Sequence, residues 1–299
     1  MNILLLGCNG QVGWELQRAL APLGDVTALS VDTPGPWQAD LSRPAALTPL
    51  LDALRPRLIV NAAAYTAVDR AESEPERARA INAMAPGVLA GWAAAHLATL
   101  VHYSTDYVFD GSGDHARAED AATGPLNVYG RSKLEGEQAI RASRCHHLIL
   151  RTSWVYAARG GNFVRTMLRL AAERDALDVV DDQVGAPTGA ELLADVTAHA
   201  LRTLRARPEL AGTYHCTAAG ETSWHGYACH VIEWARARGH PVKPAPDAVR
   251  PTPSGAYPTP ARRPLNSRLD CRRLQRTFGL NLPPWQAGVE RMLAEVLGP

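Results

Sequence analysis

The feature that most constrains the fold is a glycine-rich turn near the start of the chain, between a short apolar run and a helical pattern. Residues 2–6 suit a buried parallel strand, and Gly7, Gly10 and Gly13 follow at intervals of three. Gly7 permits a tight turn, Gly10 lets the backbone approach a ligand, and Gly13 allows close packing of helix against strand. The helix N-terminus then faces an anion, so the sequence predicts a dinucleotide site, the alternative being an ordinary βα turn.

The cofactor residues are expected at the carboxyl ends of the first strands. A second strand is predicted over 26–31, and Asp32 after it either meets the adenosine ribose, which favours NAD, or is a plain loop residue. Asp40 and Leu41, after a third short strand position, are candidates to contact adenine. Arg18 and Arg43 are the local cations for a 2′-phosphate, so the choice between NADH and NADPH stays open. The predicted cofactor set is Gly7, Asn9, Gly10, Gln11, Val12, Asp32, Asp40, Leu41, Ala62, Ala63, Ala64, Tyr65, Tyr129 and Lys133.

Two further buried strands are predicted in the middle of the chain. The first spans 57–65 and ends in three alanines (62–64), which either leave room for a ligand or pack in the core. A long helix is expected over 75–98, in which Asn82 either anchors backbone groups or is solvated. The strand over 97–103 runs into Thr105 and Asp106, at the sheet edge where ligands bind in open α/β folds.

Tyr129 and Lys133 lie four residues apart on a predicted helix, so their side chains share one face, with Cβ atoms about 5–6 Å apart. A nearby ammonium is expected to lower the pKa of the phenol, which could then exchange a proton with a substrate oxygen. Alone, this spacing is weak and is typical of many surface helices. Thr105 and the predicted nicotinamide site turn it into a constellation for hydride transfer.

The totals exclude several classes of protein. The chain has 299 residues, 46% hydrophobic and 20% charged, which is typical of a globular protein with a substantial core. A net charge of +1 predicts neither nucleic-acid nor membrane-surface binding. Five scattered cysteines favour reduced thiols and a cytoplasmic location. The apolar run at the N-terminus is too short for a signal peptide, and no membrane segment is expected.

The second half of the chain continues less regularly. Helices are predicted over 162–172, 190–204 and 223–236, the last with Ser223 as its N-cap, and a short strand over 213–216. Eight prolines between 241 and 264 exclude a helix and predict an extended covering loop, or a surface linker. The arginines that end this segment suit a diphosphate.

Five runs and two later motifs carry a resemblance that spans nearly the whole chain. They are G-x-x-GQVG at 7–13, NAAAYTAVD at 61–69, STDYVFDG at 104–111, YG-x-SK-x-x-GE at 129–137, RTSWVY at 151–156, DQ-x-G-x-PT at 182–188 and RP-x-NS-x-LD at 263–270. With these motifs the chain resembles the dTDP-4-dehydrorhamnose reductases, a family of extended short-chain dehydrogenases/reductases. Dehydratases of that superfamily usually carry Asp-Glu after the threonine, whereas Tyr107 follows Asp106 here, which favours simple reduction.

The resemblance implies a fold and a reaction. The fold is α/β, a Rossmann-type doubly wound parallel sheet with a smaller C-terminal substrate domain. Residues 1–151 form the NAD(P)-binding domain, to which segments near 190–216 return, and residues 152–299 form mainly the nucleotide-sugar domain. The reaction is NAD(P)H-dependent reduction of the C4 ketone of dTDP-4-dehydro-L-rhamnose to dTDP-L-rhamnose, in nucleotide-sugar, cell-surface polysaccharide and lipopolysaccharide synthesis.

The resemblance also assigns the site residues. Tyr129 donates the proton, Lys133 lowers its pKa and contacts the nicotinamide ribose, and Thr105 polarises the carbonyl. The predicted substrate-binding residues are Thr105, Asp106, Trp154 and Arg263. NADPH is the expected cofactor, with NADH as a second possibility. In some members a magnesium ion bridges two subunits, and Glu15, Glu191 and Glu295 stand at matching positions, as metal ligands of a homodimer or as three exposed helix glutamates.

Two other functions stay open from the sequence. One is a reductase or epimerase of another nucleotide sugar. The other is a non-catalytic, NADP-binding regulatory subunit of a methionine adenosyltransferase, because the same fold serves in that role. Such a subunit need not retain Thr105, Tyr129 and Lys133, all of which are present here.

Overall fold

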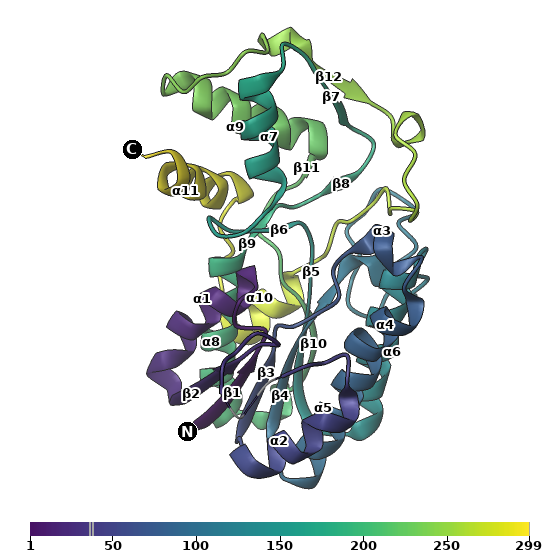
Figure 1. Ribbon diagram of the computed structural model, residues 1–299, viewed down its shortest axis with the longest axis vertical. Coiled ribbons are helices and arrows are strands. Elements are labelled where there is room, and N and C mark those ends of the chain that lie inside the picture. The colour runs from purple at the N-terminus through teal and green to yellow at the C-terminus, as the bar shows by residue number, and fades with distance from the viewer. Residues whose placement is uncertain (36, 38, 299) are drawn as a thin grey trace.

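A computed structural model describes residues 1–35, 37 and 39–298. The chain forms a larger lobe built on a six-stranded sheet and a smaller lobe of three helices and short strand pairs (Figure 1). Both termini lie on one side of the molecule, the N-terminus in the larger lobe and the C-terminus in the smaller one. Within the part of the chain that the structure describes, no helix is long and apolar enough to span a bilayer.

The central sheet is wholly parallel, with the order β10-β5-β4-β3-β1-β2. The central strands β1 and β3 are short apolar runs, because both faces of the sheet are covered by helices. The order reverses beside β1, which creates the crevice where Rossmann-type sheets bind their ligands. The predicted fold class is therefore confirmed. The strands are β1 (Asn2–Leu6), β2 (Asp25–Leu29), β3 (Leu58–Asn61), β4 (Thr99–Thr105), β5 (His146–Thr152) and β10 (Gly212–His215).

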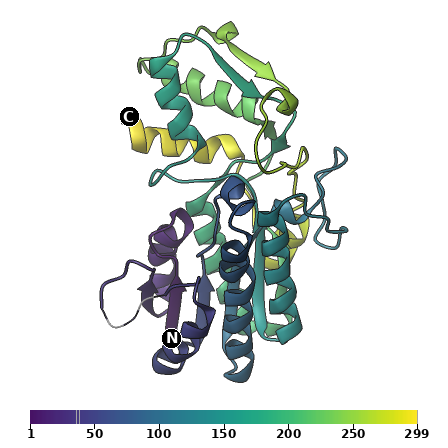
Figure 2. The ribbon, with the colours of Figure 1, turned by 45° about the vertical axis from the view of Figure 1, so that its right-hand side comes forward.

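Helices pack on both faces of the sheet, as Figure 1 shows. One face is covered by α1 (Gln11–Leu20), α8 (Ala190–Ala206) and α10 (Arg272–Phe278), whose leucines join the core cluster of β1, β4 and β5. The other face is covered by α2 (Leu47–Leu54), α5 (Ala85–Ala95) and α6 (Val128–Ser143). The short α3 (Val68–Ala71) lies at the carboxyl end of this second face, beneath the smaller lobe (Figure 2).

Three predictions about the larger lobe need correction. The long helix predicted over 75–98 is α4 (Pro75–Arg79), a π-helical turn (Ala80–Met84) and α5, which ends at Ala95. The second strand covers residues 25–29 rather than 26–31. The strand predicted over 57–65 is β3, which ends at Asn61. The third short strand position, before Asp40, falls partly on residues 36 and 38, which lie outside the described residues. Short 3-10 turns fill other connections, at Ala21–Leu23, Pro44–Ala46, Asp106–Val108 and Pro208–Leu210.

The smaller lobe packs α7 (Phe163–Glu173), α9 (Trp224–Ala237) and α11 (Trp285–Leu297) around an aromatic core. Ser223 caps α9 by accepting a hydrogen bond from Gly226 N–H at 3.0 Å, as predicted. The lobe holds three two-stranded pairs, β6 (Val155–Tyr156) with β9 (Thr188–Gly189), β7 (Leu177–Val180) with β12 (Val249–Thr252), and β8 (Val184–Gly185) with β11 (Thr222–Ser223).

The proline-rich segment 241–264 contains no α-helix but is not a bare loop. It includes β12 and two single 3-10 turns, Pro246–Ala248 and Ser254–Ala256, which the expectation of a purely extended chain missed. Pro246 fits the first position of its turn because its missing N–H would be unpaired there. The segment then returns to the larger lobe, where the Arg262 carbonyl oxygen accepts a hydrogen bond from Asn127 Nδ2 at 2.8 Å.

Candidate active site

Helix α6 carries the tyrosine and the lysine of the predicted site, and two of its glycines seat it against neighbouring backbone. Asn127 caps its amino end by accepting a hydrogen bond from Gly130 N–H at 2.8 Å. A Cβ at Gly130 would lie 2.2 Å from the Tyr107 carbonyl oxygen, and one at Gly136 would lie 2.1 Å from that of Asn82. A larger residue at Gly130 would push the helix away from the turn that follows β4, and one at Gly136 would push it away from the π-helical turn Ala80–Met84.

Thr105 and Tyr129 come together at the carboxyl end of β4. The Thr105 hydroxyl accepts a hydrogen bond from Tyr107 N–H at 3.2 Å and donates one to Asp106 Oδ1 at 3.0 Å. Burial raises the pKa of Tyr129 to about 12, and a hydrogen bond with Thr105 works in the opposite direction. The phenol therefore carries its proton at neutral pH, which suits it to donate one.

Asp106 is 3% exposed, and its second carboxylate oxygen, Oδ2, has no hydrogen-bond partner among the described residues. Burial raises its pKa to about 6, while hydrogen bonds from Ser267 and Thr105 act to lower it. A buried polar atom without a partner is costly, so this oxygen is a natural contact for a ligand hydroxyl. Ser267 belongs to the second half of the chain and had no predicted role.

Lys133 is buried, and its amino group reaches two groups on β4. Lys133 Nζ donates to the Tyr103 carbonyl oxygen at 2.6 Å and lies 3.2 Å from His102 Nε2. Burial lowers the pKa of Lys133 to about 8. Burial of the phenol is the main cause that raises the pKa of Tyr129, and Lys133 is not among the groups that act on it, so the predicted lowering by Lys133 stays a prediction.

The glycine turn packs as its spacing predicts. A Cβ at Gly7, which has a φ of +83°, would lie 2.6 Å from Ala63 N. A Cβ at Gly13 would lie 2.0 Å from the Gly7 carbonyl oxygen, so this glycine lets α1 pack directly on the turn. Gly10 is exposed, and its Cβ would meet the Gly7 oxygen at 3.4 Å. The first two constraints come from the protein's own backbone, and the exposed Gly10 leaves the amino end of α1 open.

The side chains around this turn are partly engaged within the protein. Asn9 Nδ2 donates to Ser30 Oγ at 2.8 Å, which ties the turn to the end of β2. Gln11 Oε1 accepts a hydrogen bond from Asn162 Nδ2 at 3.5 Å, across the two lobes. Val12 is half-buried and packs against the first core cluster.

The residues predicted to contact the adenosine half of the cofactor differ in how exposed they are and in how far the protein itself engages them. Asp32 is exposed in the turn after β2. Asp40 Oδ1 already accepts hydrogen bonds from Ser42 N–H at 2.9 Å and Ser42 Oγ–H at 2.6 Å, while Leu41 is buried in the second core cluster. Asp40 therefore shapes its own turn, whatever else it contacts.

Ala62, Ala63 and Ala64 form a half-buried stretch after β3, at the same edge as the glycine turn. Tyr65 follows, and Asn82 holds its backbone by accepting from Tyr65 N–H at 2.9 Å and donating to Tyr65 O at 3.0 Å. Of the two roles open from the sequence, Asn82 therefore anchors backbone groups.

Trp154 lies where the two lobes meet, in the left-handed region with a φ of +49°. Its ring stacks on Trp224, with centroids 3.7 Å apart. Such a backbone is uncommon for a bulky residue, and its cost is sustained by packing around it. Stacking on Trp224 thus holds the strained tryptophan in one orientation.

Arg263 makes an ion pair that the sequence did not reveal. Its guanidinium donates to both carboxylate oxygens of Asp69, at 2.5 and 2.7 Å, and the same carboxylate accepts from Ala261 N–H at 3.1 Å. Hydrogen bonds from Arg263 lower the pKa of Asp69, against the effect of burial. Arg263 fastens the proline-rich segment to the larger lobe, and a diphosphate would have to compete with Asp69 for it.

The three glutamates predicted as metal ligands face one region. Burial raises the pKa of Glu191, and the charges of Glu15 and Glu295 add to this shift. Glu15 also lies 3.6 Å from Arg18. Within the residues that the structure describes, no three His, Cys, Asp or Glu side chains of this one chain form a metal-binding group.

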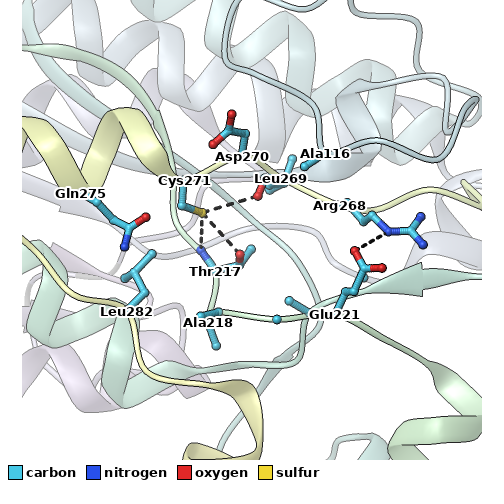
Figure 3. Close-up of a pocket in the computed structure, with 14 residues that line it drawn as sticks. Ala116, Thr217, Ala218, Glu221, Arg268, Leu269, Asp270, Cys271, Gln275 and Leu282 are labelled. Atoms are coloured by element: carbon cyan, nitrogen blue, oxygen red, sulfur yellow. Dashed lines mark hydrogen bonds and ion pairs between the residues drawn. The ribbon is translucent and has the colours of Figure 1, made fainter.

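A separate pocket of about 290 Å³ opens beside the edge strand β10 (Figure 3). Arg268 and Glu221 form an ion pair at its rim, at 2.6 Å. The Cys271 thiol accepts a hydrogen bond from Thr217 N–H at 3.3 Å, and burial raises its pKa. All five cysteines of the chain are free. The lining includes none of the predicted site residues, so this hollow is distinct from the region around Tyr129.

Sequence reasoning missed four contributors, His102, Ser267, Asp69 and Glu137. His102 gave little signal, because a single polar residue in an apolar stretch is most often a satisfied core group. Ser267, Asp69 and Glu137 stood inside the quoted motifs without a role. Their partners, Arg263 and Arg151, are 194 and 14 residues away, and the sequence spacing does not indicate such pairings.

The sheet, the glycine turn and the Thr105–Tyr129–Lys133 set define an oxidoreductase of the extended short-chain dehydrogenase/reductase class. The family model described as "RmlD substrate binding domain" matches residues 1–297. The chain belongs to this family.

Relatives and solved structures agree with that placement. A dTDP-4-dehydrorhamnose reductase of Escherichia coli (strain K12) is 55% identical over 296 residues, covering 99% of this chain and 98% of the relative. The crystal structure of a dTDP-4-dehydrorhamnose reductase from Clostridium acetobutylicum is similar with a TM-score of 0.87 and 34% identity, covering 99% of this chain and all of that one. The crystal structure of the Bacillus anthracis dTDP-4-dehydrorhamnose reductase in complex with NADP is similar with a TM-score of 0.84 and 32% identity, covering 98% of each chain.

Proposed function

We propose that this protein reduces the C4 ketone of dTDP-4-dehydro-L-rhamnose to dTDP-L-rhamnose with NADPH. The observation that carries the proposal is the meeting of the Thr105 hydroxyl and the Tyr129 phenol at the carboxyl end of β4. The names of the similar reductases supply the sugar and the nucleotide. The product is a precursor for cell-surface polysaccharide, including lipopolysaccharide.

The chain's own residues account for the proton side of the reaction. Tyr129 donates its phenolic proton to the carbonyl oxygen as that oxygen becomes an alcohol, and Thr105 holds the oxygen by a hydrogen bond. The raised pKa of Tyr129 keeps the phenol protonated until then. Bound NADPH supplies the hydride. Asp106 Oδ2, buried and without a partner among the described residues, accepts a hydrogen bond from a sugar hydroxyl.

The cofactor site is assigned to the turn around Gly10, the stretch 62–65 and Lys133. NADP in the similar Bacillus anthracis structure supports NADPH, and NADH remains a second cofactor to test. Arg18 is engaged with Asp195 at 2.9 Å, whereas Arg43 is exposed and suits a 2′-phosphate. We assign the sugar nucleotide to the face below Trp154.

The proposed domain division is 1–151 with the later segments α8 and β10 for the cofactor, and mainly 152–299 for the nucleotide sugar. Both segments pack on the central sheet, while α7, α9 and α11 surround a core of their own. The glycine turn lies in the first part and Trp154 in the second, so the reaction takes place between the two lobes.

The decisive test of the chemistry is Tyr129→Phe. Loss of the proton donor is expected to lower the rate of NADPH oxidation with dTDP-4-dehydrorhamnose by about 10²- to 10⁴-fold. Tyr103→Phe is the matched control, because that phenol bonds to Thr197 at 2.6 Å on the other face of the sheet. Near-normal turnover by Tyr129→Phe would show that the acid assignment is wrong.

Two rival functions are separated by the same assay. A panel of dTDP-, UDP- and GDP-linked keto sugars, each with NADPH and with NADH, distinguishes this reductase from a reductase or epimerase of another sugar. Cofactor binding without oxidation of NADPH by any of them would favour a non-catalytic regulatory subunit of a methionine adenosyltransferase.

Magnesium and a homodimer form one further proposal for this cytoplasmic enzyme. Carboxylate oxygens are the ligands that Mg²⁺ prefers, and the charges of Glu15 and Glu295 both act on Glu191. Because the described residues of one chain make no complete site, two subunits would contribute ligands. Sedimentation with magnesium and with a chelator decides: a dimer that persists unchanged in chelator would contradict the bridge.

A further inference from the structure

A buried chain of polar groups runs from β3 through β4 to Lys133. Asn61 ends β3, His102 lies beside it on β4 in register, and Lys133 reaches them from α6. Asn61 and His102 are each 1% exposed and Lys133 is 2% exposed. The chain leads into the protein and not to solvent, so it does not carry protons away from the site.

The orientation of the Asn61 amide is fixed by the backbone. Ala63 N–H can only donate, and it lies 3.2 Å from Asn61 Oδ1. The other end of the amide, Nδ2, is also only a donor, and it lies 3.2 Å from His102 Nδ1. His102 Nδ1 must therefore accept, which places the proton of the neutral ring on Nε2.

That tautomer has a consequence for Lys133. His102 Nε2–H points at Lys133 Nζ over 3.2 Å, and Nζ also donates to the Tyr103 carbonyl oxygen. A charged ammonium has no lone pair and would face the ring N–H as a second donor. An uncharged amine accepts from His102 and donates to Tyr103, so every contact in the chain is then satisfied.

The surrounding charges do not reverse this preference. Burial is the largest cause that lowers the pKa of His102, so the ring is neutral whether or not Lys133 carries a charge. On α6 itself Glu137 raises the pKa of Lys133, but burial outweighs it. Glu137 is paired with Arg151 of β5 at 2.7 Å.

The other elements around α6 direct their charged groups elsewhere. Glu72 beside α3 accepts from Val128 N–H, and Arg79 of α4 pairs with Glu135. Asp106, after β4, acts on the Tyr129 phenol. The buried residues of α5 are alanines, a proline, a leucine and a tryptophan.

We propose that Asn61 and His102 are positioning residues that lock one tautomer, and that the locked Nε2–H favours the uncharged amine of Lys133. Lys133 is thereby held in place beside the site, and it gives up its proton more readily than an exposed lysine until a ligand offers it new acceptor oxygens. The link to catalysis rests on the proposed reductase function. The lock itself is a property of the cofactor-free protein.

Asn61→Asp tests the lock with almost no change of shape. A carboxylate would accept from Ala63 N–H with one oxygen and from His102 Nδ1–H with the other. The ring proton should move to Nδ1, and Nε2 should then accept from a charged Lys133. Nitrogen NMR of labelled histidine in the cofactor-free protein reads the tautomer, and the His102 signal is identified by its loss in His102→Gln.

The wild type is expected to show the Nε2–H form and Asn61→Asp the Nδ1–H form. An Nδ1–H ring in the wild type, or an unchanged ring in Asn61→Asp, would overturn the proposal. His146→Gln is the control, because that ring lies at the opposite end of β4 and β5, on the Thr99 hydroxyl. It should leave the His102 signal where it is.

A second measurement follows Lys133 itself. Comparing the stability of each protein with its Lys133→Met counterpart across pH gives the pH at which Lys133 loses its proton. Asn61→Asp should raise that pH by about one unit or more, because it favours the charged form. If Asn61→Asp does not fold, His102→Gln presents a carbonyl oxygen to the ammonium and should shift it in the same direction. No shift in the variant tested would contradict the role assigned to His102.

In Asn61→Asp, the pH dependence of the rate of keto-sugar reduction should shift in the same direction as the pH at which Lys133 loses its proton. An unshifted profile, despite the tautomer change, would overturn the role in catalysis and leave the lock as a structural feature. A protein that reduces no keto sugar would contradict the proposed function, and the tautomer and stability measurements would still decide on the lock.

Discussion

Lys133 and Glu137 lie one turn apart on α6, and both are almost fully buried, yet their surroundings are opposite in kind. Glu137 is bound to Arg151 through two hydrogen bonds of 2.7 and 2.8 Å, to Ser104 at 2.6 Å and to Arg141 at 2.9 Å. Lys133 contacts a carbonyl oxygen and a neutral ring. One turn of helix thus carries a satisfied charge and an unsatisfied one.

The pKa values follow this difference. Burial acts to raise the pKa of Glu137, but hydrogen bonds and charge from Arg151 outweigh it, and the net shift is downward. For Lys133 burial prevails over the charge of Glu137, and the pKa falls to about 8. A fully paired buried charge fixes structure, whereas an incompletely paired one is free to respond to a ligand.

The largest expected effect on stability comes from the Glu137–Arg151 ion pair. Glu137→Gln keeps the shape of the side chain but leaves the buried Arg151 guanidinium without its counter-charge. Breaking a buried pair in this way typically costs about 3–5 kcal/mol, so the free energy of unfolding in urea should fall by that amount. Glu137→Met combined with Arg151→Met removes both charges and should recover part of the loss. A single variant as stable as the wild type would show that the pair is not structural.

Replacement of Lys133 should change the activity rather than the stability. Lys133→Met removes a buried, poorly compensated charge, so the free energy of unfolding at neutral pH should change by no more than about 1 kcal/mol. Reduction of the keto sugar should fall about a hundredfold or more. A stability loss as large as that of Glu137→Gln would mean that both residues are structural.

The same variant gives a pH dependence of known sign. In the folded protein Lys133 releases its proton at about pH 8, whereas the unfolded chain holds it up to about 10.5. Between these values the unfolded state binds more protons, so the wild type gains stability relative to Lys133→Met as the pH rises. Below pH 8 the difference should be constant. A wild type that loses stability in this window, relative to the variant, would contradict the lowered pKa.

The comparison also shows how far the sequence could predict this site. The strand, the glycine turn and the helix follow from local pattern, and so does the common face of Tyr129 and Lys133. The upward shift of the Tyr129 pKa does not follow from the sequence, because the spacing of two residues along a helix does not show what buries the phenol. The partners of Lys133 were equally hidden, because the register between β3 and β4 brings Asn61 beside His102 from 41 residues away.

Longer-range contacts were hidden for the same reason. The π-helical turn at 80–84 continues a helical pattern, and its sequence does not distinguish the two forms. Arg263 was expected to bind a ligand because guanidinium suits phosphate, but Asp69 offers it a carboxylate of matching shape. A residue type predicts the chemistry available to a side chain, whereas the partner depends on the fold.

The smallest expected effect comes from the outermost member of the Glu137 cluster. The Arg141 side chain is 39% exposed, and it donates to the same Glu137 oxygen that Arg151 Nη2 contacts from inside. Water screens such a pair, so Arg141→Ala should lower the free energy of unfolding by less than about 1 kcal/mol, and less at high salt than at low salt. Urea unfolding at two salt concentrations measures this difference. The control is Arg169→Ala, because Arg169 forms an exposed ion pair with Glu173, one turn further along α7. A loss near that of Glu137→Gln would mean that the whole cluster acts as one unit, and the contrast with Lys133 would then extend to the surface of α6.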